Sequence, residues 1–316
     1  MEIKTGRIGV LMGGPSSERE ISLKSGKAVY AALRKMGVDA VAIDITTGDT
    51  EGNIRLIKSQ DIDCAFIALH GFFGEDGKIQ SILDALLIPY TGSGKSASML
   101  AMDKVAARKI IAARGLSVPR YKVVQKCSDG ENLTRQIHFA LPWVIKPIGH
   151  GSSVGLSIID ERRDLSRALK IAFAYDDALV EEYIKGREVT VGILGDVALP
   201  VIEIVPKNRF FDYQAKYTPG MTDYILPAKL PEHVAARIQD AALSAHQALG
   251  CSGCSRVDMI LDKTDTPFVL ELNSIPGFTE TSLLPKAAGI TGIEFGELCL
   301  KLIRLAYEKA EAPLPR

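Results

Sequence analysis

Cys254-Ser-Arg-Val-Asp-Met-Ile-Leu261 and Phe268-Val-Leu-Glu-Leu-Asn273 alternate polar with apolar residues, and a polar stretch at 262–267 joins them. Alternation with a period of two is typical of a β-strand that has one buried face. The joining stretch contains Asp, Lys, Thr and Pro, which favour a turn. The sequence therefore predicts two strands paired as a hairpin.

The polar face of this hairpin has an unusual composition. Residues i and i+2 of a strand face the same side, so Arg256 points with Asp258, and Glu271 points with Asn273. Three oxygen-bearing side chains and one guanidinium then share a face, which suits Mg²⁺ that holds a polyphosphate. A simple amphipathic hairpin with a solvated charged face is the alternative.

Length and composition limit the class of protein. The 316 residues predict two or three domains. The chain is 47% hydrophobic and 24% charged with a net charge of zero, so no electrostatic bias favours nucleic acid or a membrane as partner. The five cysteines are scattered, and the N-terminus has no apolar signal core. We expect a cytoplasmic protein without membrane spans.

The first third of the chain alternates strand and helix patterns. Strands are expected at 7–12, 38–45 and 64–69, and helices at 21–35, 54–59 and 78–87. This order predicts a parallel sheet with helices on its faces, and ligands gather at the carboxyl ends of such strands. Polar loops follow there at 13–20 and 70–77. A nicotinamide interpretation of the first loop lacks the third glycine of the dinucleotide motif.

A second glycine-rich loop follows the strand that ends at Lys146. The loop, 147–155, is rich in Gly and Ser, which let backbone N–H groups approach phosphate oxygens beside the lysine charge. An ordinary flexible hairpin is the alternative. Further on, 178–184 reads as a strand that runs into a hinge where adenine can bind, with Glu188 placed to accept from ribose hydroxyls. A helix is expected at 102–114.

Ordered motifs along nearly the whole chain resemble those of one family. They are G-G-P-S-S-E-R-E-I-S at 13–22, H-G-F-F-G-E-D-G at 70–77, Y-T-G-S-G at 90–94, M-D-K at 102–104, W-V-I-K-P at 143–147, G-S-S-V-G at 151–155, F-D-Y-Q-A-K-Y at 211–217, R-V-D at 256–258 and E-L-N-S-I-P-G-F-T at 271–279. Together they resemble the D-alanine–D-alanine ligase family of the ATP-grasp superfamily. One departure is His150, where many relatives carry Glu or Leu.

The resemblance implies roles for individual residues. ATP would be bound by Lys104, Lys146, Ser152, Ser153, Glu181, Tyr183, Ile184, Glu188 and Lys216. Two Mg²⁺ or Mn²⁺ ions would be held by Asp258, Glu271 and Asn273. The substrate-binding residues would be Glu18, His70, Ser282 and Leu283, and the catalytic ones Glu18, Ser152, Tyr217 and Arg256. The segment 207–224 resembles the family's mobile loop.

The resemblance also implies an architecture and an activity. The expected fold is α/β: an N-terminal parallel-sheet preATP-grasp domain at 1–102, then a two-domain ATP-grasp fold of α+β type at 103–186 and 187–316. The implied activity joins two D-alanines with ATP through a D-alanyl phosphate, which supplies peptidoglycan synthesis, and the implied assembly is a homodimer. The alternatives are a ligase that uses another acceptor such as D-lactate, and a non-catalytic ATP-grasp binding protein.

Overall fold

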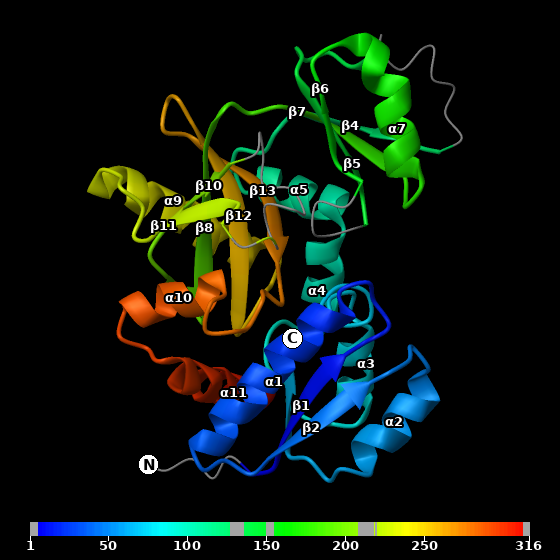
Figure 1. Ribbon diagram of the computed structural model, residues 1–316, viewed down its shortest axis with the longest axis vertical. Helices are drawn as coiled ribbons and strands as arrows, with labels where there is room; N and C mark the ends of the chain where they lie inside the picture. The colour runs from blue at the N-terminus through cyan, green and yellow to red at the C-terminus, as the bar shows by residue number, and fades with distance from the viewer. Residues whose placement is uncertain (1–5, 127–135, 150–154, 208–217, 219, 312–316) are drawn as a thin grey trace.

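The computed structural model describes all residues except 1–5, 127–135, 150–154, 208–217, 219 and 312–316 (Figure 1). Its strands form three sheets. The first sheet is parallel and has the order β2-β1-β3. Its strands are β1 (Ile8–Gly13), β2 (Ala40–Ile45) and β3 (Cys64–Ile67). The predicted parallel sheet is confirmed.

Helices cover both faces of this sheet (Figure 1), and every residue of β1 and β3 is buried, whereas β2 is partly exposed. The helices are α1 (Arg19–Lys35), α2 (Thr50–Lys58), α3 (Lys78–Ala85) and α11 (Phe295–Glu311). Val29 of α1 and Leu302 of α11 share one buried core, while Ile57 of α2 and Ile82 of α3 belong to another. The last helix of the chain therefore completes the first sheet's core.

The second sheet is antiparallel, with the order β4-β7-β5-β6. Its elements are β4 (Tyr121–Val124), β5 (Trp143–Pro147), β6 (Ser157–Ile159), β7 (Ala178–Glu182), a 3₁₀ turn at Arg162–Asp164 and α7 (Leu165–Phe173). Trp143, fully buried, packs with Leu169 of α7 in the core of this unit. The strand expected before the glycine-rich loop is present as β5.

The third sheet has the order β11-β10-β8-β12-β13, with β9 beside β8. Its elements are β8 (Gly186–Leu194), β9 (Val197–Ala198), β10 (Ile202–Pro206), β11 (Thr222–Ile225), β12 (Cys254–Asp262), β13 (Pro267–Asn273), α9 (Glu232–Ala248) and α10 (Leu283–Ile290). The predicted hairpin is β12–β13, and it is antiparallel. Val257 and Met259 pack under α9, which leaves the alternate residues of β12 on the opposite face.

Two short helices connect the first sheet to the other two (Figure 1). They are α4 (Lys95–Met102) and α5 (Lys104–Ala113); α5 is the helix predicted over 102–114, and α4 was not predicted. Asp103 causes the break: its backbone is extended, and its carboxylate accepts from the N–H groups of Val105 and Ala106 at 2.9 and 3.0 Å. An N-cap of this kind starts a new helix at Lys104.

Candidate active site

A pocket of 360 Å³ brings together residues from the first sheet's loops, from α5 and from the β12–β13 hairpin. Eight of the residues singled out in the sequence line it: Glu18, His70, Lys104, Arg256, Glu271, Asn273, Ser282 and Leu283. They come from positions up to 265 residues apart, between Glu18 and Leu283. A polar pocket built from so many segments is the expected form of a substrate site.

The hairpin places its polar residues as predicted. Asp258 stands opposite Glu271, and Arg256 stands opposite Asn273. The Arg256 guanidinium donates two hydrogen bonds to the Asp258 carboxylate, at 2.9 and 2.8 Å, and Thr190 on β8 donates a third at 2.6 Å. A forked pair of this kind fixes the orientation of the guanidinium, which lines the pocket.

The oxygen ligands of the hairpin suit Mg²⁺ that is shared with a polyphosphate. Mg²⁺ takes one or two carboxylates and fills its remaining positions with water and phosphate oxygens. Asp258 and Glu271 supply two carboxylates, and Asn273 supplies an amide oxygen that accepts from the Ile275 N–H at 3.1 Å. Over the described residues no cluster of three or more His, Cys, Asp or Glu forms a separate metal site. The donor set therefore fits a metal that arrives with the nucleotide.

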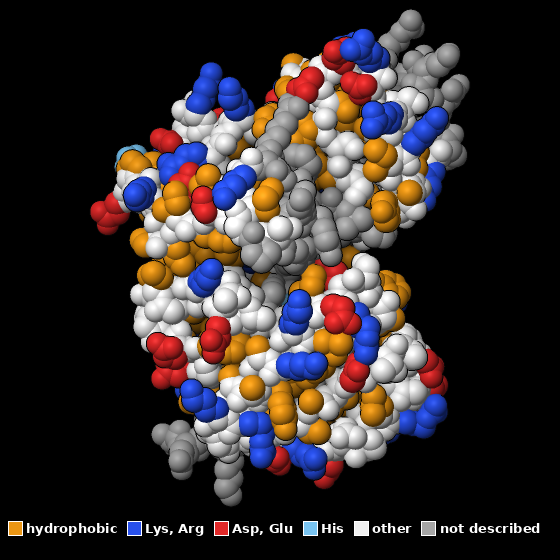
Figure 2. All heavy atoms as spheres, in the orientation of Figure 1, with side chains coloured by type: hydrophobic (Ala, Val, Ile, Leu, Met, Phe, Trp, Pro, Cys, Tyr) orange, Lys and Arg blue, Asp and Glu red, His pale blue; other side chains and the backbone are white. Residues whose placement is uncertain are grey.

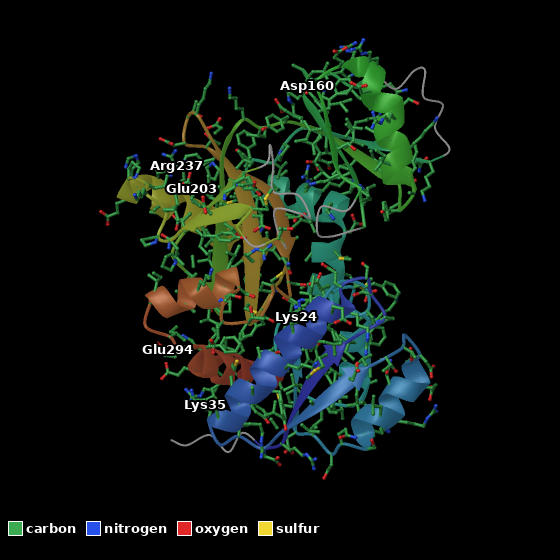
Figure 3. All side chains as sticks on the ribbon, in the orientation of Figure 1. Lys24, Lys35, Asp160, Glu203, Arg237 and Glu294 are labelled. Atoms are coloured by element: carbon green, nitrogen blue, oxygen red, sulfur yellow. The ribbon has the colours of Figure 1, made fainter. Side chains whose placement is uncertain are left out.

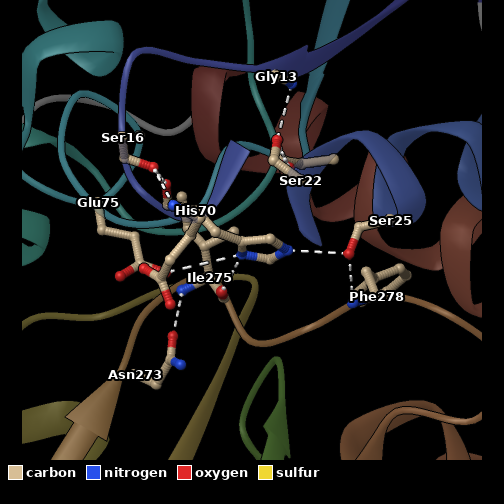
Figure 4. A network of polar contacts seen from close by, with 12 residues as sticks. Gly13, Ser16, Ser22, Ser25, His70, Glu75, Asn273, Ile275 and Phe278 are labelled. Atoms are coloured by element: carbon tan, nitrogen blue, oxygen red, sulfur yellow. Dashed lines mark hydrogen bonds and ion pairs between the residues drawn. The ribbon is translucent and has the colours of Figure 1, made fainter. Parts of the chain in front are cut away.

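His70 joins the N-terminal part of the site to the segment after β13 (Figure 4). Its Nδ1 lies 3.1 Å from the Ile275 carbonyl, which only accepts, so Nδ1 carries a proton. Its Nε2 lies 2.9 Å from Ser25 Oγ. The same Ser25 oxygen accepts a hydrogen bond from the Phe278 N–H at 3.2 Å. In the neutral ring Ser25 then donates to Nε2, and every partner is satisfied.

Glu75 is a second carboxylate beside His70. Its Oε1 lies 3.8 Å from His70 Nδ1, and both residues line the pocket. Burial raises the pKa of Glu75, while the imidazole of His70 acts in the opposite direction. Glu18 and Glu75 thus both line the pocket that His70 also lines.

The loop after β1 holds Glu18 in place. Ser16 Oγ donates to the His70 carbonyl at 2.6 Å and accepts from the Glu18 N–H at 3.1 Å. Gly71 has a φ of +71°, and a Cβ there would lie 2.6 Å from Glu18 Oε2. The left-handed backbone favours glycine at this position, and a side chain there would displace the Glu18 carboxylate.

Buried cations gather where α5 meets the second sheet. Lys104 Nζ donates to the Ile148 carbonyl at 3.2 Å, just after β5. Burial lowers the pKa of Lys104 to about 8, although nearby Glu271 opposes this change. Lys146 Nζ lies 3.0 Å from Glu181 Oε1, and both side chains are buried. The two lysines expected to contact ATP phosphates thus lie in one buried cluster.

The segment expected to hold adenine connects two sheets. Glu181 lies in β7 of the second sheet, Tyr183 and Ile184 follow the end of that strand, and Glu188 lies in β8 of the third sheet. The Tyr183 N–H donates to the Pro142 carbonyl at 3.2 Å. The Glu181 carboxylate pairs with Lys146, so its side chain belongs to the cation cluster.

Ser282 precedes α10 within a group of hydroxyl residues. Its Oγ lies 2.8 Å from Thr279 Oγ1 and accepts from the Thr279 N–H at 3.1 Å. Thr279, Thr281, Ser282 and Leu283 all line the pocket. The predicted residues Ser152, Ser153, Lys216 and Tyr217, together with His150, lie outside the described residues.

Several residues of the site were not singled out from the sequence. They are Lys24, Ser25, Glu75, Arg108, Thr190, Tyr224 and Thr279. Lys24 lies in the half of α1 nearer the hairpin, and Lys35 lies near its far end (Figure 3). Glu75 is part of the quoted 70–77 loop, and Thr279 ends the 271–279 motif, so those motifs contained a signal. The roles of Ser25 and Thr190 depend on partners far away in the chain and left no local pattern.

The chain matches two family models. The model described as D-ala D-ala ligase N-terminus covers residues 7–53 and 48–93, and the one described as D-ala D-ala ligase C-terminus covers 110–304. A D-alanine–D-alanine ligase of Geotalea uraniireducens is 49% identical over 309 residues, which are 98% of each chain. A D-alanine–D-alanine ligase of Pelotomaculum thermopropionicum is 49% identical over 316 residues, which cover 96% of this chain and 97% of the relative.

Solved structures show the same similarity. The Bacillus anthracis D-alanine–D-alanine ligase complexed with ATP has a TM-score of 0.85 and 34% identity, over 97% of this chain and 99% of that one. The VanG D-Ala:D-Ser ligase of Enterococcus faecalis has a TM-score of 0.83 and 33% identity, over 95% and 99%. On the family models and the full-length relatives, the chain belongs to the D-alanine–D-alanine ligase family.

Proposed function

We propose that the protein joins two D-alanines into D-alanyl-D-alanine and converts ATP to ADP and phosphate. Family membership supports this activity, and the ATP complex of the Bacillus anthracis relative supports ATP as substrate. The observation that carries the proposal is the single pocket shared by Glu18, Arg256 and Ser282. That pocket supplies a carboxylate for an ammonium, a guanidinium for an oxyanion and a hydroxyl donor for a carboxylate.

The first step activates a carboxylate. An oxygen of the first D-alanine attacks the γ-phosphorus of ATP, the bond to ADP breaks, and D-alanyl phosphate forms. Glu18 binds the ammonium of this D-alanine, and His70 lies near its carboxylate. Lys104 and Lys146 contact the phosphates, and such cations neutralise charge in the transferring group.

The nucleotide also brings metal chemistry to the hairpin. Asp258, Glu271 and Asn273 would hold Mg²⁺ or Mn²⁺, which polarises phosphoryl oxygens when bound. Glu181, Tyr183 and Ile184 form the adenine hinge, and Glu188 holds the ribose. Ser152, Ser153 and Lys216 complete the phosphate contacts by resemblance to the family.

The second step forms the peptide bond. The free amine of the second D-alanine attacks the acyl carbon, phosphate leaves, and the amine's surplus proton passes to solvent. Arg256, oriented by Asp258, stabilises the oxyanion that develops on the acyl oxygen. Ser282 and the backbone of Leu283 receive the acceptor carboxylate at the start of α10. By resemblance, Tyr217 joins Glu18 and Ser152 in a hydrogen-bonded network.

We also propose the domain bounds, the oligomeric state and the cellular location from the resemblance to the family. The chain has three domains, at 1–102, 103–186 and 187–316, each containing one sheet. It acts as a homodimer in the cytoplasm and supplies the dipeptide for peptidoglycan. Over the described residues, no helix has both the length and the apolarity of a membrane span. Basic and acidic side chains are interspersed on the face shown in Figure 2.

The acceptor is the point on which close relatives differ. The Enterococcus faecalis relative is named as a D-Ala:D-Ser ligase, so the fold alone does not choose the acceptor. The curated relatives that cover the full chain at 49% identity are named D-alanine–D-alanine ligases, which favours D-alanine. D-Lactate as acceptor is the remaining alternative from the sequence.

One assay tests the activity and the acceptor together. Phosphate release from Mg·ATP is measured with D-alanine, D-serine and D-lactate, each alone and each paired with D-alanine, and products are separated by mass. We expect phosphate and D-alanyl-D-alanine in equal amounts with D-alanine alone. Nucleotide binding without any ligated product would instead indicate a non-catalytic ATP-grasp protein.

A further inference from the structure

Arg108 is a fully buried cation to which the proposed mechanism assigns no role. It lies one helical turn after Lys104, on the same face of α5, and its side chain is 2% exposed. Two cations at this spacing repel each other, and burial removes the water that would screen them. A buried guanidinium therefore needs negative partners among its neighbours.

Arg108 contacts two different sheets through one nitrogen. Its Nη2 lies 2.8 Å from Glu181 Oε1 in β7 of the second sheet. The same Nη2 donates to the Leu270 carbonyl in β13 of the third sheet, at 3.0 Å. Leu270 directly precedes Glu271, the central carboxylate of the hairpin. One side chain thus ties the strand of the adenine hinge to the strand of the metal ligands.

The bridge also reaches a phosphate-binding lysine. Glu181 Oε1 lies 3.0 Å from Lys146 Nζ, so Arg108 and Lys146 share one carboxylate oxygen. Lys104 is close enough for both cations to lower its pKa. Three buried cations lie near Glu181, and Lys104 also lies near Glu271. Among the described residues, Nε and Nη1 of Arg108 and Oε1 of Glu181 are buried without a hydrogen-bond partner, so the contacts of Arg108 and Lys146 with Glu181 are ion pairs. The cluster has an excess of positive charge that a polyphosphate offsets.

We propose that Arg108 is a positioning residue for the nucleotide, acting through Glu181 and Lys146 on one side and through the Leu270 carbonyl on the other. This bridge from Glu181 through Arg108 to Leu270 sets the spacing of the second and third sheets, so that Lys146 and the metal held by Glu271 contact the same polyphosphate. This inference deepens the proposed function, since it concerns the nucleotide half of that site. It assigns no contact between Arg108 and the amino-acid substrates.

The test compares nucleotide affinity with amino-acid affinity. Arg108→Met keeps length and apolar volume but removes the charge and donors, and Arg108→Lys keeps the charge without the fork. Calorimetry measures binding of Mg·ADP, and kinetics measure KM for ATP and for D-alanine. We expect Arg108→Met to weaken ADP binding and raise the KM for ATP at least about tenfold, with Arg108→Lys between it and wild type. The KM for D-alanine stays within about twofold.

Ile111→Val is the matched packing control, since Ile111 is buried on the same helix and carries no charge. It lowers the melting temperature and leaves ADP affinity unchanged. If Arg108→Met binds ADP within about twofold of wild type, or if the KM values for ATP and D-alanine rise together, the positioning role is wrong. If Arg108→Met fails to fold, Arg108→Lys carries the test, and it must weaken ADP binding at least about threefold.

The two proposals fail separately. Calorimetry with ADP needs no acceptor and no product, so it tests the bridge even if the wild-type protein forms no dipeptide. Conversely, dipeptide synthesis by wild type with normal ADP affinity in Arg108→Met supports the proposed function and overturns the bridge.

Discussion

At the scale of single residues, the proposed metal ligand Glu271 gives the most direct test of the mechanism. It stands opposite Asp258 in the hairpin register, lines the pocket and lies close enough to Lys104 to affect its pKa. Glu271→Gln keeps the shape and removes one negative charge from the metal ligands. We expect turnover to fall at least about a hundredfold, roughly 3 kcal/mol of transition-state stabilisation.

Steady-state rates at saturating Mg·ATP measure this loss, and a titration with Mg²⁺ accompanies them. Glu280→Gln is a control for the charge change, since Glu280 is exposed and does not line the pocket. Wild-type turnover of Glu271→Gln at saturating Mg²⁺ contradicts the metal assignment.

Ser282 provides a second test at this scale. Its hydroxyl is aligned by Thr279, and we assign it to the carboxylate of the acceptor D-alanine. Ser282→Ala removes a hydrogen bond to a charged group, a loss of about 1.5–3 kcal/mol. The KM for the second D-alanine is therefore expected to rise about tenfold to a hundredfold, with the KM for the first D-alanine unchanged. Initial rates over a wide D-alanine range separate the two constants, and equal changes in both refute the assignment.

How far the site was predictable depends on the distance between partners. Asp258 and Glu271 were placed on one face correctly, because strand periodicity is a local property. Helix α5 was predicted, whereas α4 was missed, because its sequence has only a weak amphipathic pattern and the Asp103 cap separates it from α5. The His70 contact with Ile275 spans 205 residues, and no local pattern encodes it.

At the scale of elements, a buried contact of His246 joins α9 to the third sheet. Its Nδ1 lies 2.7 Å from Ser255 Oγ in β12, and the ring is 2% exposed. Burial lowers the pKa of His246 to about 4 from 6.5, with Asp196 acting in the opposite direction. The structure thus holds this imidazole neutral directly beneath the hairpin that carries Arg256.

This imidazole makes stability depend on pH. Above pH 6.5 the ring is neutral in both the folded and the unfolded chain, so its contribution is fully present. Between pH 6.5 and about 4 the unfolded chain binds a proton that the folded protein excludes, so stability falls as pH falls, by about 3 kcal/mol in total. We expect His246→Gln, which cannot become charged, to flatten this part of the stability profile.

Urea unfolding between pH 7.5 and 4.5 measures the effect as a difference between variant and wild type. His233→Gln on the exposed side of the same helix is the control and should leave the profile unchanged. Parallel profiles for His246→Gln and wild type would show that the buried ring does not cause the acid sensitivity.

At the scale of the whole molecule, the site exists only where three sheets meet. Loops of the first sheet carry Glu18 and His70, the second sheet carries Lys146, and the third carries Arg256 and its hairpin partners. The family's motifs supplied this assembly from the sequence, whereas strand and helix patterns predicted the elements but not how they meet. Such spacing depends on packing and on buried bridges such as Arg108.

In the proposed reaction, ATP activates the D-alanine carboxylate before the peptide bond forms. The most direct measurement uses D-alanine labelled with ¹⁸O in both carboxylate oxygens, with Mg·ATP in ordinary water. We expect the released phosphate to carry one labelled oxygen for each dipeptide formed, because the oxygen that attacks phosphorus leaves with it. Unlabelled phosphate released together with dipeptide would contradict activation through D-alanyl phosphate.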